Sequence, residues 1–491
     1  MFKYDFLKRD VPAGAVIFKD GNKIVSHIYD RNIEFIDDDA SKVIQMTINL
    51  LYENGGGVIF IRKGVYDITT PLYGKSNIQI FGEGFTTILR VSENKTVLAL
   101  NYLENAVVCN LKIEAPVSSK TYAVTLYESK KCILDKIYLK AGKGIQLEGQ
   151  NNIIQNSFLE GSGSEFVGEW AIGVGGVGNK ILNNEMWGWG HNCIMGSPNR
   201  GVIANNYFHD FYDDCIDPNG NYDVVIIGNT CVKGNLDIVG AFVSLEYNCE
   251  NFVIANNLIR KMPGGVSIRD SKNIVIVGNR FVQPRISSAS FVAVEGDSDG
   301  ILVIGNYAEA KLLTSILFGT KTTLKSKIQI LDNILYGTIH PAYIAYIKNA
   351  IGVVVKNNVG TIYGFDNGPY ITEEGDSNGN IIEGNLGHSW QYPERGYKLF
   401  IEKVGANTIV RNNIGFRTEG SGSAIISAGN TYVDVSHGLS VTPDINKIVI
   451  IPKDNLNGRS FWVSDVTSTT FRINISSADT VNHVFSWSYK E

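Results

Sequence analysis

The feature that most constrains the fold is a short phrase that recurs through most of the chain. It reads apolar, any residue, apolar, any residue, Asn, any residue, apolar, as in VIANNYF and VIVGNRF, with steps of about 21 to 28 residues between copies. Its Asn is Asn110, Asn156, Asn184, Asn206, Asn229, Asn257, Asn279, Asn306, Asn333, Asn358, Asn385 and Asn413, and Asp135 takes the same position in ILDKIYL. Repeats of this length indicate a solenoid.

The alternating β-branched residues around each Asn indicate strands rather than helices. A leucine-rich repeat would need a Leu/Asn pattern that is missing. Two or three short strands and their turns per repeat make one coil of a right-handed parallel β-helix, with neighbouring coils about 4.8 Å apart. A residue that recurs once per coil then stacks on itself. An unpaired buried amide costs about 1–3 kcal/mol, so we expect the Asn residues to form a structural, hydrogen-bonded ladder.

The two ends of the chain differ from the repeats. Residues 37–52 predict a helix that covers the open end of the solenoid, with Asp38 or Asp39 as its N-cap and an apolar face of Val43, Ile44, Ile48 and Leu51. After Asn413 the phrase stops, and short strands separated by turns predict a small β-sandwich. The expected organisation is an N-terminal segment over 1–36, an all-β parallel β-helix domain with its capping helix over 37–425, and a small β-sandwich over 426–491.

Composition narrows the functional classes. The 491-residue chain has a formal net charge of -5, and only 19% of its residues are charged. A nucleic-acid partner would favour a basic chain, and no apolar run is long enough for a membrane span, so neither nucleic-acid binding nor membrane insertion is expected. No apolar secretory signal is visible at the start, which fits a virion protein or a processed extracellular or cell-surface protein. The six Cys are scattered singly and predict buried, reduced thiols.

The strand register predicts which side chains face outward. The segments GIQLEG, AIGVGG, CIMGSP, CIDPNG, FVSLEY, GVSIRD and FVAVEG align by their alternating apolar residues, which point inward. The outward pairs are then Gln146/Glu148, Gly173/Gly175, Met195/Ser197, Asp217/Asn219, Ser244/Glu246, Ser267/Arg269 and Ala293/Glu295. We expect Asp217, Glu246 and Arg269 to form one column with steps of about 5 Å, beside an open floor at the glycines.

More acidic, His and aromatic residues lie next to this column in the sequence. Acids and amides bind sugar hydroxyls, and aromatic faces stack on sugar rings. The candidate catalytic residues are Asp213, Asp214, Asp217, Glu246 and Arg269, and the candidate substrate-binding residues are Glu185, Trp187, Trp189, His191, His209 and Tyr212. Each also has a structural interpretation. The acids are common turn residues, the tryptophans could pack under a loop, the His side chains could support the scaffold, and Glu246 with Arg269 could be a surface ion pair worth about 0–1 kcal/mol.

The opening VIFIRKGVYDIT, followed by SNIQIFGEGFTTIL, resembles that of pectate-lyase-like β-helix proteins, including many phage tailspikes. The Asn-rich coils are similar to the same superfamily over roughly residues 35–425. The resemblance implies a parallel β-helix that binds or processes a polysaccharide, as a tailspike does in a virion and commonly as a homotrimer. The last segment resembles small β-sandwich modules of viral and microbial surface proteins.

Two polysaccharide chemistries fit the candidate residues. In a glycoside hydrolase, one carboxyl protonates the leaving oxygen while another activates water or attacks carbon. Asp217 and Glu246 about 5 Å apart would give the retaining geometry, and a more distant Asp213 or Asp214 would give the inverting one. Arg269 would keep Glu246 ionised, so an Asp of the pair would need the raised pKa. The pair DDCI resembles a polygalacturonase motif, but the companion motifs of that family are absent. We favour the hydrolase, which needs no cofactor.

The alternative chemistry is a polysaccharide lyase or uronate epimerase. By resemblance to pectate lyases, Asp213, Asp217 and Glu246 could hold Ca²⁺, for which oxygen ligands are suited, and Arg269 could assist proton abstraction. An acidic groove without a metal would repel an acidic polymer. A third hypothesis is a tailspike-like adhesin that binds glycan without cutting it, because such a protein needs aromatic and polar groups but no close carboxyl pair.

Overall fold

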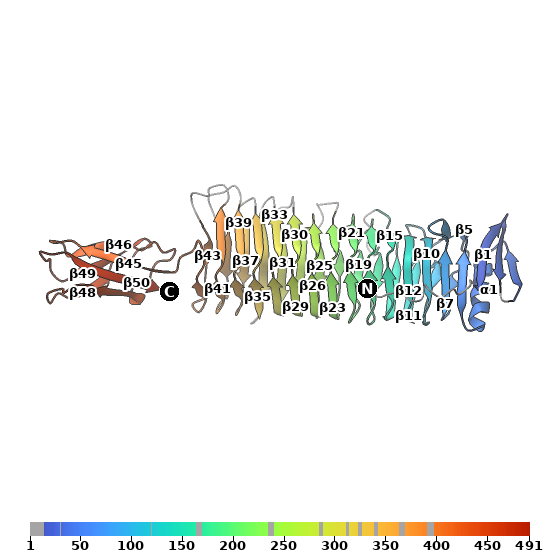
Figure 1. Ribbon diagram of the computed structural model, residues 1–491, viewed down its shortest axis with the longest axis horizontal. Helices are drawn as coiled ribbons and strands as arrows, with labels where there is room; N and C mark the ends of the chain where they lie inside the picture. Colours follow the sequence, from blue (N-terminus) through green and yellow to red (C-terminus); the bar gives the residue numbers. More distant parts are fainter. Residues whose placement is uncertain are drawn as a thin grey trace. The chain divides into compact units, whose positions relative to one another are not determined.

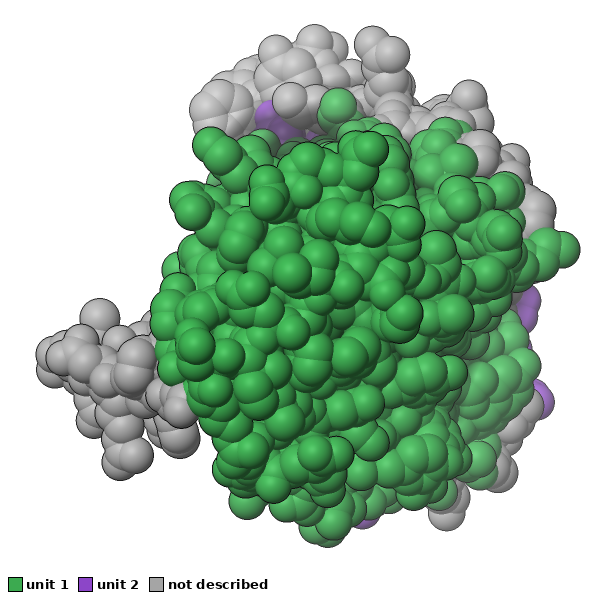
Figure 2. Space-filling view, turned by 90° about the vertical axis from the view of Figure 1, so that its right-hand side faces the viewer, with its two compact units in different colours: residues 1–302 green, residues 303–491 purple. Residues whose placement is uncertain are grey.

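The structure is a computed structural model that describes residues 14–29, 31–118, 120–163, 169–233, 240–283, 288–310, 314–322, 327–337, 342–362, 369–389 and 397–491. It divides into two compact units, residues 1–302 and residues 303–491, coloured separately in Figure 2. The expected boundaries at residues 36 and 425 stay predictions.

Unit 1 begins with an antiparallel arrangement of β1 (Ala15–Asp20), β2 (Lys23–Ile28) and β3 (Ile33–Asp37), followed by helix α1 (Ala40–Glu53). The expected helix is confirmed, because Asp39 caps it by accepting hydrogen bonds from the backbone N–H groups of Ser41 and Lys42. The apolar face of the helix is buried as expected (Val43, Ile44, Ile48 and Leu51). Figure 1 places α1 at one end of the unit, and Figure 2 shows that end as a closed surface.

The remainder of unit 1 is a stack of coils (Figure 1). Each coil contributes an a-strand before the Asn position, a b-strand after it and a c-strand after a further turn. The a-strands are β4 (Gly57–Ile61), β7 (Ile78–Gly82), β10 (Val107–Glu114), β12 (Ile133–Lys140), β14 (Ile153–Gln155), β17 (Lys180–Leu182), β20 (Val202–Ala204), β23 (Tyr222–Ile227), β26 (Glu250–Ala255) and β29 (Lys272–Val277). The longer β10 and β12 run on into b-strand positions, and β32 (Asp299–Ile304) crosses the boundary between the units.

The b-strands of unit 1 are β5 (Gly64–Asp67), β8 (Thr87–Arg90), β15 (Phe158–Glu160), β18 (Glu185–Trp187), β21 (Tyr207–His209), β24 (Thr230–Val232), β27 (Leu258–Arg260) and β30 (Arg280–Gln283). Its c-strands are β6 (Leu72–Tyr73), β9 (Leu98–Ala99), β11 (Val124–Lys130), β13 (Ile145–Gln150), β16 (Ile172–Val174), β19 (Ile194–Gly196), β22 (Ile216–Asp217), β25 (Ala241–Leu245), β28 (Gly264–Arg269) and β31 (Ser288–Gly296). Neighbouring coils pair in parallel within each series. The outer surfaces of these two series are called the b-face and the c-face below.

Unit 2 contains further coils and then an antiparallel module. The coil strands are β33 (Tyr307–Ala310), β34 (Thr314–Thr322), β35 (Ile328–Leu331), β36 (Ile334–Gly337), β37 (Ala342–Lys348), β38 (Val354–Lys356), β39 (Val359–Ile362), β40 (Tyr370–Glu374), β41 (Ile381–Glu383), β42 (Leu386–Ser389), β43 (Phe400–Glu402) and β44 (Ile409–Arg411). The module holds β45 (Glu419–Ile426), β46 (Tyr432–Ser436), the 3₁₀ turn η3 (Ile445–Lys447), β47 (Ile448–Pro452), β48 (Phe461–Ser464), β49 (Thr470–Ile475) and β50 (His483–Lys490).

The antiparallel module confirms the small sandwich predicted at the C-terminal end. Its two sheets have the strand orders β45-β50-β47 and β46-β49-β48. They share one apolar core, in which Phe471, Ile473, Phe485 and Trp487 are buried. The first of these strands begins at Glu419, a few residues before the expected domain boundary.

The expected Asn ladder is present in both units. In unit 1, each side-chain amide donates to the Oδ1 of the next at 2.9–3.1 Å, through Asn184, Asn206, Asn229, Asn257 and Asn279. In unit 2, the same 3.0 Å contacts join Asn306, Asn333, Asn358, Asn385 and Asn413. Each of these side chains is buried or nearly so, which is why the amides satisfy one another.

The first Asn positions of the repeat were wrong by one residue. Asn156 is exposed, and the position beside Asn184 is taken by Ser157, whose N–H donates to Asn184 Oδ1 at 3.0 Å. Asn110 likewise lies outside the ladder, with a φ of 59°. Asp135 pairs with Gln155, which lies two residues before Ser157, so Asp135 is also outside the ladder. The expected thiols are confirmed, since all six Cys are free and buried.

Candidate functional site

The predicted site residues divide between two faces of unit 1. Glu185 and Trp187 belong to b-strand β18 and His209 to b-strand β21, whereas Asp217 belongs to c-strand β22. Between the two series the chain passes through a b–c turn, such as residues 188–193 or 210–215. A single groove containing all the candidates was therefore wrong, because residues close in sequence lie on opposite sides of this turn.

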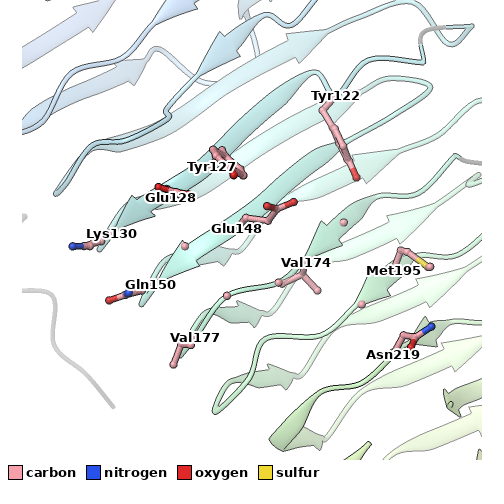
Figure 3. A pocket seen from close by; sticks show the side chains of 15 residues that line it. Tyr122, Tyr127, Glu128, Lys130, Glu148, Gln150, Val174, Val177, Met195 and Asn219 are labelled. Atoms are coloured by element: carbon pink, nitrogen blue, oxygen red, sulfur yellow. The ribbon is translucent and has the colours of Figure 1, made fainter. Parts of the chain in front are cut away.

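The c-face carries a long groove of about 750 Å³. Its lining comes from successive coils: Tyr122, Tyr127, Glu128, Lys130, Glu148, Gly149, Gln150, Gly173, Val174, Gly175, Gly176, Val177, Met195, Gly196 and Asn219. Figure 3 shows Tyr122, Glu148, Met195 and Asn219 reaching into it from neighbouring strands. As expected, Gly173 and Gly175 line this groove, which also extends to earlier coils through Tyr122 and Tyr127.

One wall of the groove is an aromatic group that the sequence reasoning missed. Trp170 donates its indole N–H to the Tyr122 hydroxyl at 2.7 Å, and the Lys143 ammonium lies 4.4 Å from both ring centroids. A Cβ at Gly173 would lie 2.3 Å from the Tyr122 hydroxyl oxygen, so only glycine leaves room for this pair. The sequence signal that could have predicted this wall was the glycine-rich coil, because glycines leave space that side chains of the neighbouring coils can fill.

The acidic candidates adjoin the end of this groove. Met195 pairs with Asp217 across β19 and β22, and Asn219 bridges to Glu246 on the next coil. The expected single column was therefore wrong. Asp217 lies two residues before Asn219, which is the residue opposite Glu246. Two steps of about 3.3 Å along the strand and one interstrand spacing of about 4.8 Å therefore separate the Cα atoms of Asp217 and Glu246 by about 8 Å. Both still belong to the c-face.

Arg269 lies beside Glu246, as expected, but it also contacts a residue of the following coil. Its guanidinium is 3.9 Å from Glu246 Oε1 and 3.0 Å from Glu295 Oε2, and Arg269 and Glu295 are register partners. Both carboxylates are partly exposed. The column is thus Asn219, Glu246, Arg269 and Glu295.

Asp217 has a perturbed protonation equilibrium. Burial, together with the negative charge of Glu246, raises its pKa to about 6 against the opposing effect of a hydrogen bond from Asn192. Asn192 Nδ2 donates to Asp217 Oδ2 at 3.1 Å. A carboxyl of this kind is partly protonated near neutral pH, which is the property required of an acid beside an ionised partner.

Asp213 and Asp214 occupy the b–c turn before Asp217. Asp213 Oδ2 lies 3.1 Å from His191 Nε2, and the buried Lys233 ammonium donates to the Asp213 backbone oxygen at 2.8 Å. Asp214 Oδ1 accepts a hydrogen bond from the Ala241 N–H. Burial raises the pKa of Asp214 to about 7. These contacts assign both aspartates to the support of the turn, with Asp214 held away from solvent.

Several candidates have clear structural positions. Trp189 is fully buried and donates its indole N–H to the Leu159 backbone oxygen at 3.1 Å, so its assignment to substrate binding was wrong. Ser197 and Ser244, expected to face outward, are buried. Tyr212 donates its hydroxyl to the Gly163 backbone oxygen at 3.1 Å. His191 lies beside the Asp213 carboxylate in the b–c turn.

The calcium site expected of Asp213, Asp217 and Glu246 stays a prediction. Within the described ranges, no three or more His, Cys, Asp or Glu side chains are grouped so that they could hold a metal ion. In that same part of the chain, no helix has the length and apolarity needed to span a membrane.

The fold is a right-handed parallel β-helix, and its c-face groove ends at a carboxyl cluster. Among solved structures, the chain is similar to the tailspike protein of E. coli bacteriophage HK620. A variant of that protein in complex with a hexasaccharide matches with a TM-score of 0.59 and 11% identity, covering 92% of this chain and 90% of the other. A double variant matches with a TM-score of 0.51, 12% identity and the same coverage. No family model matches the sequence, and neither does any curated protein.

Proposed function

We propose that the protein is a polysaccharide-cleaving glycoside hydrolase whose active site is the c-face groove. The observation that carries the proposal is the pair of unlike carboxyl groups at the end of that groove. Asp217 has a pKa raised to about 6, and Glu246 lies beside the Arg269 cation. A glycosidase needs one carboxyl that is protonated and one that is ionised.

The geometry supports a division of roles between the two residues. Asp217, held by Asn192, is the general acid that protonates the glycosidic oxygen. Glu246 is the general base that activates a water molecule. The carboxyl groups of inverting enzymes lie about 6.5–9.5 Å apart and those of retaining enzymes about 5–5.5 Å. Because Asp217 and Glu246 lie on a diagonal of neighbouring coils and not opposite each other, we propose the wider, inverting arrangement in place of the retaining pair expected from the sequence.

The rest of the groove supplies binding. Tyr122, held by the hydrogen bond from Trp170, provides aromatic surface for a sugar ring, while Glu128, Glu148 and Gln150 provide hydrogen-bond acceptors and donors for hydroxyls. Because the groove carries more acidic than basic side chains, a neutral polysaccharide is favoured over an acidic one. The similarity in fold to a tailspike protein whose variant binds a hexasaccharide supports a polysaccharide ligand and a location on a virion or cell surface.

The deciding experiment is a polysaccharide panel measured with and without EDTA. New reducing ends without absorbance near 235 nm, unaffected by EDTA, are expected of a hydrolase that needs no metal. Absorbance that EDTA abolishes would show a calcium lyase instead, and binding without either signal would show an adhesin. We also propose a homotrimer, which light scattering on the purified protein tests directly.

A further inference from the structure

The b-face carries a second group of aromatic and charged side chains, from β12 to β21. The strand register arranges them in two rows along neighbouring coils. The first row is Tyr138, Phe158, Glu185 and Tyr207, and the second is Lys140, Glu160, Trp187 and His209. Phe158 and Tyr207 are exposed to 38% and 40%, so this face presents aromatic rings to solvent rather than to the core.

At the centre of the two rows, Trp187 and His209 form a fixed pair. Their ring planes are 2° apart, and the ring centroids are separated by 5.7 Å. His209 is held on both nitrogens, by Glu185 Oε1 at 3.1 Å and by Asp210 Oδ2 at 2.7 Å. Two carboxylate contacts fix the orientation of the imidazole, so the stacked pair is preformed.

A hollow of about 380 Å³ lies beside this pair. It is lined by Glu160, Gly161, Ser162, Gly163, Trp187, Gly188, Asp210, Phe211 and Tyr212. The Tyr212 ring is anchored at its hydroxyl by Gly163, and Glu160 is anchored by Lys140 at 2.8 Å. The volume falls within the range of about 300–1,000 Å³ that is usual for ligand sites.

We propose that this hollow is a second carbohydrate-binding site, which holds a neutral sugar residue without cleaving it. Trp187 and Tyr212 provide the rings on which the C–H face of a pyranose stacks, and Asp210 and Glu160 accept hydrogen bonds from its hydroxyls. Asp210, with a side chain exposed to 63%, keeps the mouth of the hollow negative, so an acidic sugar is disfavoured. The proposal does not depend on cleavage in the c-face groove.

The site differs from the c-face groove in position and in chemistry. Trp187 and His209 belong to b-strands, and the b–c turn separates them from Asp217. The carboxylates here are already engaged with Lys140 or His209, and the pKa of Glu160 is lowered by Lys140 and Tyr138 against the effect of burial. Glu160 therefore lacks the raised pKa of an acid catalyst. A second contact with one polymer would raise the local concentration of chain ends at the groove.

The test uses the full chain and methyl glycosides of glucose, galactose, mannose and N-acetylglucosamine, with binding read by saturation-transfer difference NMR. At least one glycoside is expected to bind the wild type, and Trp187→Ala is expected to weaken that binding at least tenfold while Trp187→Phe retains most of it. Gly173→Ala separates the two sites: it crowds Tyr122 in the c-face groove, so it is expected to affect only glycoside bound there and to leave the Trp187-dependent binding unchanged.

Three outcomes would overturn the proposal: no binding of any glycoside by the wild type, binding that survives Trp187→Ala, or binding that Gly173→Ala abolishes instead. A change in oligomeric state in Trp187→Ala, measured by light scattering, would also overturn it, because the face would then be an interface between copies of the chain. Failure of the hydrolase proposal alone would leave these NMR results as they are.

Discussion

Asn192 and Asp217 lie on neighbouring coils of unit 1, and the Asn192 amide donates to the Asp217 carboxylate at 3.1 Å. The Oδ1 of the same amide is buried and has no hydrogen-bond partner among the residues that the structure describes. The Asn192 Nδ2 also lies 3.5 Å from Met195 Sδ, so the amide donates to one carboxylate and one thioether. The contact with the carboxylate stabilises the ionised form of Asp217, while burial and Glu246 favour the protonated form, so the protonation of the proposed acid depends on a balance that single substitutions can change.

Removal of either proposed catalytic carboxyl should abolish most of the activity. Asp217→Asn and Glu246→Gln are each expected to lower kcat/KM by about 10²–10⁴-fold, the usual contribution of general acid–base catalysis. Glu295→Gln is the matched control, because Glu295 also contacts Arg269 but has no role in the reaction scheme. Retained activity in both variants, with circular dichroism showing an intact fold, would remove these residues from the mechanism.

The reaction should invert the anomeric configuration. Carboxyl groups carried on a diagonal of the c-face leave space for a water molecule, which attacks the sugar from the side opposite the leaving group. Proton NMR during the first minutes of hydrolysis distinguishes the new anomer before mutarotation. A product with the configuration of the substrate would show that Glu246 acts as a nucleophile at a shorter separation.

Activity should fall as the pH rises above about 6, because the acid must be protonated. In Asn192→Leu the hydrogen bond that lowers the pKa of Asp217 is lost, so the alkaline limb of kcat/KM should move to higher pH. The maximal rate should also fall by about tenfold, since the carboxyl loses its fixed orientation. An alkaline limb that stays in place would assign that ionisation to another group.

The free energy of unfolding should depend on pH through the ionisation of Asp214. Its pKa is raised from 3.8 to about 7 by burial, so the folded state disfavours the charged form. The favourable contribution of the protonated group is full below pH 3.8 and is lost as the pH rises to about 7. Asp214→Asn should therefore raise Tm relative to the wild type more at pH 8 than at pH 5, as measured by calorimetry. An equal difference at both values would contradict the raised pKa.

The Asn ladder should make a measurable contribution to the stability of unit 1. Asn229→Ala removes the donor to Asn257 and the acceptor for Asn206, and should cost about 1–3 kcal/mol in the free energy of unfolding. The control is Asn156→Gly, which changes an exposed Asn with a φ of 52° outside the ladder and should cost much less. Urea denaturation of both variants makes the comparison, and equal losses would argue against the ladder.

The sequence predicted the coils well because their determinants are local and repeat. Alternation placed Ile145 and Leu147 inside and Gln146 and Glu148 outside, and the Asn phrase placed most of the ladder. It missed Ser157, because a hydroxyl can take the place of the amide without preserving the phrase. The sandwich core and the capping helix were also visible as apolar patterns.

The candidate site was less predictable, because it depends on turns. The segment from Trp187 to Asp217 passes twice from b-strands to c-strands, and nothing in its composition shows which side of a turn a residue occupies. Trp189 illustrates the difficulty, since it lies two residues from the partly exposed Trp187 and yet is fully buried. The pairing of Asn219 with Glu246 agrees with the predicted outward pairs, in which both residues hold the second position, so the error was to place Asp217 in the same column as Glu246.

The ladder also has a consequence for how this protein can be altered. Each ladder amide fixes the position of its own coil relative to the next coil. Coils of different length must therefore differ in segments other than the turn that holds the Asn. The chain can then gain or lose residues in the b–c turns, or a complete coil, while the faces keep their alignment. A designer could lengthen the groove by duplicating the coil from Asn184 to Asn206, because the added amide would continue the ladder and leave the register of the other coils unchanged.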